Sequence, residues 1–153
     1  VSYDGFVRCL DESGEGYSLS VYDRSGENVR AVALMGYQGP MSIAALRDYP
    51  VNAMDEARFY RLRTGEIRTP YVDIADGVAR NAVSGLTGYS ADKGCGEILL
   101  EMMPVYIADT LQEDALEALV RDGIDFLYCE DEVIHASEDG AVFSHIYEGY
   151  SVG

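Results

Sequence analysis

Residues 17 to 34 read YSLSVYDRSGENVRAVAL and carry the clearest local pattern in the chain. In residues 17 to 23, apolar or aromatic side chains alternate with polar ones, which is the two-residue period of a half-buried strand. Residues 23 to 26 have the composition of a turn, and residues 29 to 34 are a second apolar stretch. The segment therefore predicts a β-hairpin with two antiparallel strands.

The segments that flank this hairpin give weaker patterns. Residues 1 to 10 mix apolar and polar side chains, and they fit either the end of a helix or a first strand. Residues 36 to 50 contain two prolines and two glycines, which predicts an irregular connection. Asn52 is a good N-cap and Gly65 is a stop signal, so residues 53 to 63 are predicted to form a helix.

The second half of the chain predicts further strand pairs. Residues 79 to 89 are interpreted as a strand, and residues 91 to 94 as a hairpin turn after it. Residues 96 to 106, GEILLEMMPVY, are almost continuously apolar, which is typical of a central strand buried on both faces. Residues 125 to 136 have a strand–turn–strand pattern and predict another hairpin.

One segment has a distinct helical pattern. Thr110 and Glu113 have the spacing of a capping box, an apolar stripe follows, and Gly123 is the stop signal. Because hairpins imply antiparallel pairing, we expect an α+β fold with one central antiparallel sheet of about five strands and flanking helices.

The length of 153 residues is that of one ordinary domain. We therefore expect a single module over residues 1 to 153. Its predicted parts are a possible end of an N-terminal helix in residues 1 to 16, the main sheet-and-helix module in residues 17 to 122, and an additional hairpin and tail in residues 123 to 153.

The charge of the chain excludes several classes of partner. The sequence has 27 Asp and Glu against 11 Lys and Arg, which gives a formal net charge of −16. Such a surface repels nucleic acid and anionic lipid headgroups. The simplest alternative is that the acidity serves solubility alone.

Cysteine and histidine are too few and too scattered to predict a zinc site. The three cysteines are Cys9, Cys95 and Cys129, and neither histidine lies at a ligand spacing from them. An odd number of cysteines allows one disulfide at most. Cys95 is then either a turn residue or one half of a disulfide with Cys129.

The chain has neither a signal-peptide pattern nor an apolar run that could span a bilayer, and it begins at Val1. We expect it to be a piece of a longer protein, with any membrane anchor outside the segment.

Several motifs over residues 17 to 137 follow one another in the order of the Cache family of extracytoplasmic sensor domains, which the chain resembles. These are the opening strand, Asp-x-x-Gly turn and strand; Arg58-Phe59-Tyr60, where the family often has Arg-x-Trp-Tyr; and Pro70-Tyr71-Val72-Asp73 before Asp76-Gly77. The turn at Asp92-Lys93-Gly94, a strand and a leucine-bearing helix come next.

The resemblance implies a PAS-like sheet and a role in bacterial signal transduction. The parent protein would be a membrane receptor, with this module outside the cell membrane and an output domain beyond this chain. The module would bind a small metabolite such as an amino acid, a carboxylate or a purine. Val105 stands where amino-acid-binding members carry an aspartate, which disfavours an α-amino acid.

The implied ligand pocket lies between the central sheet and residues 36 to 65. Tyrosine supplies an apolar body with a polar tip, and arginine binds carboxylates through two donors, so both suit such a pocket. The alternative is that these side chains pack the core or face solvent. The candidate ligand-binding residues are Arg47, Tyr49, Arg58, Tyr60, Tyr71, Asp73 and Tyr89.

Nothing in the sequence predicts an enzyme, a metal or a cofactor. Glu97 and Glu101 share a face of the predicted strand, but their neighbours give no sign of a cleft. Cys95 lies between two glycines with no base nearby in sequence. The competing hypothesis is an interaction module of a receptor that works as a homodimer and binds no small ligand.

Overall fold

The computed structural model describes residues 2–3, 5–69, 71–137 and 141–153, which form three helices and twelve strands. In chain order these are β1 (Ser2–Tyr3), β2 (Phe6–Cys9), β3 (Tyr17–Ser25), β4 (Asn28–Tyr37), β5 (Met41–Arg47), α1 (Ala53–Glu56), β6 (Tyr60–Arg61), β7 (Ile67–Arg68), β8 (Gly85–Ser90), α2 (Cys95–Tyr106), α3 (Glu113–Arg121), β9 (Asp125–Glu130), β10 (Val133–Ala136), β11 (Val142–Ser144) and β12 (Ser151–Val152).

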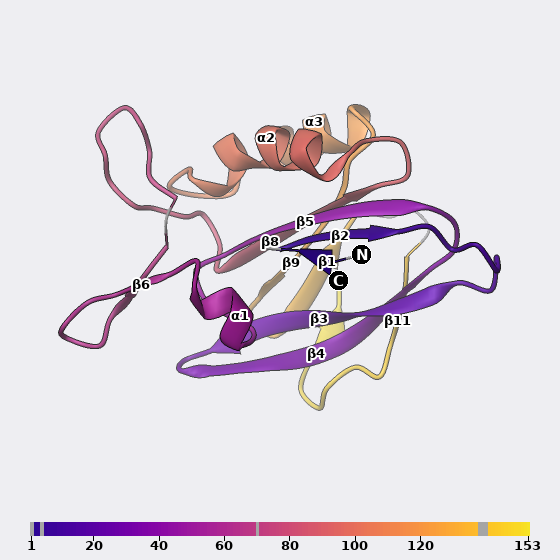
Figure 1. The fold of residues 1–153 in the computed structure, drawn as a ribbon, viewed down its shortest axis with the longest axis horizontal. Coiled ribbons are helices and arrows are strands. Elements are labelled where there is room, and N and C mark those ends of the chain that lie inside the picture. Colours follow the sequence, from indigo (N-terminus) through magenta and orange to yellow (C-terminus); the bar gives the residue numbers. More distant parts are fainter. Residues whose placement is uncertain (1, 4, 70, 138–140) are drawn as a thin grey trace.

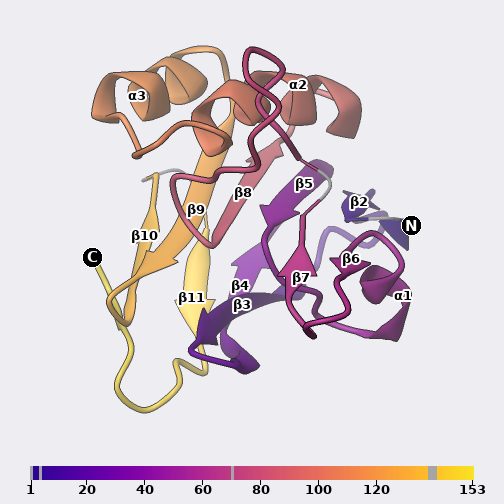
Figure 2. The same ribbon diagram turned by 90° about the vertical axis from the view of Figure 1, so that its left-hand side faces the viewer.

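The elements form three layers in an α+β fold. The larger sheet has seven strands in the order β1-β2-β5-β8-β9-β10-β12, and the smaller sheet has three in the order β11-β4-β3. Helices α2 and α3 lie side by side on one face of the larger sheet, and the smaller sheet lies on its other face (Figures 1 and 2). Neighbouring strands pair antiparallel except β10 and β12, which are parallel.

The layer of helices packs closely against the larger sheet. Ile98, Met102 and Tyr106 of α2 are fully buried, as are Leu46 of β5 and Leu86 of β8. Burying apolar side chains of this size contributes about 1.5–3 kcal/mol each.

The two sheets form a second core between their facing sides. Its buried members are Val21, Val32, Ala33, Met35, Met41, Ile43, Tyr89, Leu127, Cys129 and Ile134. Strand β5 belongs to both cores, because its side chains alternate between the two faces of the larger sheet.

Two hairpins and one helix are confirmed. Strands β3 and β4 pair from Tyr17 opposite Tyr37 to Ser25 opposite Asn28, and β9 pairs with β10. Helix α3 ends before Gly123, whose φ of 82° suits glycine at a helix stop. The helix begins at Glu113 with Gln112 as N-cap, so the predicted capping box at Thr110 is wrong.

The prediction of a central strand over residues 96 to 106 is wrong, because this segment is helix α2. Ile98, Met102, Val105 and Tyr106 are buried at the spacing of a helix face, whereas Leu100 is 75% exposed. A short apolar run does not distinguish a buried strand from a buried helix. The predicted hairpin turn at residues 91 to 94 is therefore the approach to this helix.

Residues 36 to 50 are not an irregular connection, because they contain strand β5. Pro40 and Pro50 lie outside this strand, so neither removes one of its hydrogen bonds. Residues 2–3 and 6–9 form strands, which supports the strand alternative and contradicts the helix. The sheet is therefore larger than the predicted five strands.

The helix predicted over residues 53 to 63 is correct only for its first turn. Asn52 is its N-cap, since its side-chain oxygen accepts from the Asp55 N–H at 2.9 Å. After α1 the chain forms the β6–β7 pair, where Tyr60 and Leu62 are exposed and so give a longer helix no apolar face to bury.

Three further expectations from the sequence concern residues 70 to 73, residues 79 to 89 and the cysteines. The strand predicted over residues 79 to 89 is confined to β8. Pro70 lies outside the described residues, and residues 71 to 73 have no regular structure. Cys9, Cys95 and Cys129 are all free, so the disulfide considered for Cys95 is absent.

The close approach of α2 to β8 predicts the effect of a single methyl group. A Cβ at Gly88 would overlap Met102 Sδ and lie 2.8 Å from Ile98 Cγ2, whereas one at Gly96 meets nothing within 4 Å. We expect Gly88→Ala to lower the free energy of unfolding by about 1–3 kcal/mol. Gly96→Ala should be neutral or stabilising by up to about 1 kcal/mol, because alanine favours the helix. Urea unfolding followed by circular dichroism measures both, and equal stability of the two variants would contradict this packing.

The position of Cys129 predicts slow thiol chemistry. Burial between the sheets raises the pKa of this thiol to about 12. Because only the thiolate is nucleophilic, a disulfide reagent at mildly alkaline pH should label Cys129 at least about a hundredfold more slowly in the folded chain than in denaturant. The slow phase should vanish in Cys129→Ala. Equally fast labelling of all three cysteines in the folded chain would contradict the burial.

Candidate functional site

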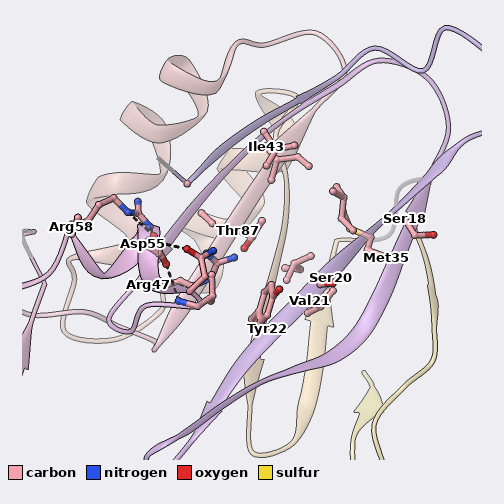
Figure 3. Close-up of a pocket in the computed structure, with 18 residues that line it drawn as sticks. Ser18, Ser20, Val21, Tyr22, Met35, Ile43, Arg47, Asp55, Arg58 and Thr87 are labelled. Carbon is pink, nitrogen blue, oxygen red and sulfur yellow. Dashed lines mark hydrogen bonds and ion pairs between the residues drawn. The ribbon is translucent and has the colours of Figure 1, made fainter. Parts of the chain in front are cut away.

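A cleft of about 970 Å³ lies between the inner face of the larger sheet and strand β3, which is the edge strand of the smaller sheet. The segment around α1, with Val51, Asn52 and Arg58 among the lining residues, borders it as well. We call this space the inter-sheet cleft. Figure 3 shows its lining residues, with Arg47, Asp55 and Arg58 gathered at one end and Ser18 and Met35 at the other.

The alternation along β5 places its side chains in this cleft. Ile43, Ala45 and Arg47 line the cleft, whereas Ala44 and Leu46 point into the core under the helices. On the neighbouring strand β8, Thr87 lies opposite Ala45 and adds a hydroxyl to the same wall.

The charged end of the cleft contains an ion pair between Asp55 of α1 and Arg58, which follows this helix. Arg58 Nε donates to Asp55 Oδ1 at 2.7 Å, and the Val51 N–H donates to Asp55 Oδ2 at 3.0 Å. The side chains of Arg58 and Asp55 are only 14% and 7% exposed. Both oxygens of the Asp55 carboxylate are thus engaged within the protein.

Arg47 differs from Arg58 in its surroundings. Its guanidinium carbon lies 5.7 Å from the centre of the Tyr22 ring, which is within the range of a cation–π contact. In the described part of the chain, no carboxylate forms an ion pair with Arg47. Arg47 therefore presents a positive charge at the cleft that no carboxylate among the described residues neutralises.

The rest of the cleft is mainly apolar, with hydroxyls at its edge. Val21, Met35, Ile43 and Leu127 supply the apolar wall. Ser18 and Ser20 are exposed residues of β3 that also line the cleft. An apolar wall with a few polar groups is the usual composition of a small-molecule site.

Of the seven predicted ligand-binding residues, only Arg47 and Arg58 line this cleft. Tyr49 is buried beside it and donates its hydroxyl to the Tyr22 carbonyl at 3.2 Å; burial raises the pKa of this hydroxyl. Tyr89 is fully buried in the core between the sheets, edge-on to Tyr37.

The other three predicted residues lie elsewhere. Tyr60 is 67% exposed on β6. Tyr71 packs edge-on against Tyr106, with ring centres 6.0 Å apart, on the side of the larger sheet that the helices cover. Asp73 pairs with Arg80 at 3.2 Å and accepts from the Ala75 N–H, as an aspartate does in a turn. The structure therefore does not bring these residues together with Arg47 and Arg58.

Sequence reasoning missed most residues of the cleft, among them Tyr22, Asp55 and Thr87. Tyr22 and Thr87 lie in predicted strands and Asp55 in a predicted helix, but none of them was selected as a ligand-binding residue. Asp55 and Thr87 reach the cleft only through strand pairing and the turn of α1, which no local pattern indicates.

A second polar cluster lies near a smaller hollow of about 350 Å³, which Arg24 and Asn81 help to line. Asp48 Oδ2 accepts from Arg24 Nη2 at 3.1 Å and from Asn81 Nδ2 at 3.2 Å. Burial raises the pKa of Asp48, and its Oδ1 has no hydrogen-bond partner among the described residues. The hydroxyl of Tyr106 is likewise buried without one.

The described residues contain neither a candidate metal site nor a candidate membrane-spanning helix. No three His, Cys, Asp or Glu residues in that part of the chain lie where they could hold a metal ion. No helix there is both long and apolar enough to cross a bilayer.

In the comparison with known proteins, neither a protein-family model nor a curated protein matches this chain.

Proposed function

We propose that this chain is a sensor module that binds a small metabolite in the inter-sheet cleft. The observation that carries the proposal is the cleft itself. Its volume of about 970 Å³ is at the upper end of the usual range for small-molecule sites, and its wall combines apolar side chains with a few polar ones, the charged ones gathered at one end.

The resemblance to the Cache family supports a sensing role. In this proposal the fold is a variant of the PAS-like sheet, and the module is the extracytoplasmic part of a bacterial membrane receptor. The membrane anchor and the output domain belong to the parent protein. The module performs no catalysis, and ligand binding is its biochemical activity.

The position of the cleft links ligand binding to the two ends of the described chain. A ligand there touches the larger sheet, strand β3 of the smaller sheet and the segment around α1. The first and last strands, β1 and β12, form the two edges of the larger sheet. A ligand that binds one arrangement of the layers more tightly shifts the population of molecules toward that arrangement. Because β1 and β12 belong to the larger sheet, the two ends of the described chain move with this sheet.

Thermal unfolding with a panel of carboxylates, purines, amines and amino acids tests the proposal. A ligand at about a hundred times its dissociation constant stabilises a fold by about 2.7 kcal/mol. For a chain of this length we expect the melting temperature to rise by about 5–10 °C. Absence of any shift across the panel would contradict a small-molecule sensor.

Two threonine-to-tryptophan variants locate the binding. Thr87 faces the cleft from β8, whereas Thr110 is an exposed residue between α2 and α3 that does not line it. Thr87→Trp should place an indole in the cleft and abolish the shift, and Thr110→Trp should leave it unchanged. If both variants keep the shift, the ligand binds elsewhere.

The alternative function is a homodimeric interaction module without a small ligand. The observation that favours it is a group of exposed apolar side chains near the C-terminal end, among them Val142, Tyr147 and Val152. Exposed apolar side chains that gather in one patch are typical of an interface.

Sedimentation at increasing concentration tests this alternative. A dimer that forms through these residues should dissociate in Val142→Asp and persist in Leu100→Asp, because Leu100 is an exposed residue of α2. Such a dimer together with a negative ligand panel would favour the interaction module over the sensor.

A further inference from the structure

We propose that the ligand of the inter-sheet cleft is a small organic monocarboxylate with an apolar body, and that its carboxylate binds the guanidinium of Arg47. This inference rests on the proposed function and names the chemical class that the cleft accepts.

The charges of the lining support an anion. Three described lining residues are charged: Arg47, Asp55 and Arg58. Asp55 pairs with Arg58, whereas Arg47 forms no ion pair with a carboxylate in the described part of the chain. In a chain with 27 acidic residues against 11 basic ones, carboxylates to neutralise an arginine are abundant. A partly buried guanidinium that has no carboxylate partner within the protein is a site where an anionic ligand forms the missing ion pair.

The contact with Tyr22 positions the guanidinium for this role. The Tyr22 ring lies against Arg47 at 5.7 Å from its guanidinium carbon. Stacking uses the face of a guanidinium, and its N–H groups project from the edge in a planar fork. That fork matches the two oxygens of a carboxylate, which it binds through two parallel hydrogen bonds.

The same lining disfavours a cationic ligand. An ammonium group needs a carboxylate or several neutral acceptors. Among the described lining residues Asp55 is the carboxylate, and its two oxygens already accept from Arg58 and from the Val51 N–H. An amine would also meet the positive charge of Arg47. The cleft therefore selects a carboxylate that carries no ammonium group.

The remaining wall sets the body of the ligand. Val21, Met35 and Ile43 offer apolar surface away from the charged end (Figure 3), and Leu127 is a further apolar lining residue. A ligand with its carboxylate at Arg47 would extend a hydrocarbon chain or an aromatic ring along this surface. Apolar contact of this kind contributes about 25 cal/mol for each Å² that leaves water.

Titration calorimetry with two matched sets of compounds tests the inference. The sets are octanoate, octylamine and octanol, and phenylacetate, phenylethylamine and phenylethanol. Within each set the apolar body is the same and only the polar group differs. We expect a carboxylate to bind at least about tenfold more tightly than its alcohol, because a charged hydrogen bond is stronger than a neutral one, and we expect its amine to show no binding.

Substitution of Arg47 gives the second arm of the test. Arg47→Met keeps much of the volume and removes the charge, and it should weaken carboxylate binding about tenfold to a hundredfold while alcohol binding stays the same. Arg61→Met is the control, because Arg61 is exposed on β6 and does not line the cleft. Arg47→Lys provides a second variant that keeps the charge. Its affinity for the carboxylate should lie between that of Arg47→Met and that of the natural chain.

The outcomes separate the two proposals. An amine or alcohol that binds as tightly as its carboxylate, or a carboxylate unaffected by Arg47→Met, overturns the ligand class. If that binding is still abolished by Thr87→Trp, the proposed function stands. If no compound binds, and if no member of the wider panel changes the melting temperature, both the ligand class and the proposed function are overturned.

Discussion

The burial of strand β5 on both faces is the constraint on which the rest of the structure depends. Residues 41 to 46 are all buried, because helices cover one face of the larger sheet and the smaller sheet faces the other. Side chains along a strand alternate between faces, so each residue of β5 must suit one of two different environments. Ala44 and Leu46 pack under the helices, while Ile43 and Arg47 face the cleft.

The helix side of this arrangement is close-packed, whereas the sheet side combines a buried core with an open cleft. At Gly88 the backbone of β8 approaches α2 so closely that a Cβ would overlap Met102. Between the sheets, β3 is an edge strand, and space remains beside it for the cleft. The cleft is therefore where a ligand can bind with little cost in packing.

The distribution of charge gives the cleft its character. Several arginines of this acidic chain pair with carboxylates, as Arg24 does with Asp48 and Arg80 with Asp73 and Asp76. Arg47 contacts an aromatic ring in place of a carboxylate. A net negative molecule slows the approach of anions, so a carboxylate ligand would bind through local contacts in the cleft and not through long-range attraction.

The sequence by itself determined the elements whose signals are local. The alternation of residues 17 to 23 with the turn after it predicted the β3–β4 hairpin, and the pattern of residues 125 to 136 predicted the β9–β10 pair. The apolar stripe before Gly123 predicted α3, and Asn52 was identified as an N-cap. Each of these depends on the backbone preferences and hydrogen bonds of residues that are neighbours in the chain.

Only the tertiary structure decided the features that depend on distant segments. Residues 96 to 106 form a helix because a face of the larger sheet is there to cover, and their apolar run alone does not distinguish helix from strand. Arg47 and Arg58 were candidates from sequence, but Tyr22, Asp55 and Thr87 join them through strand pairing within the larger sheet, packing of the two sheets and the turn at α1. The cleft is a space between layers, and residues far apart in the chain create it only when those layers pack.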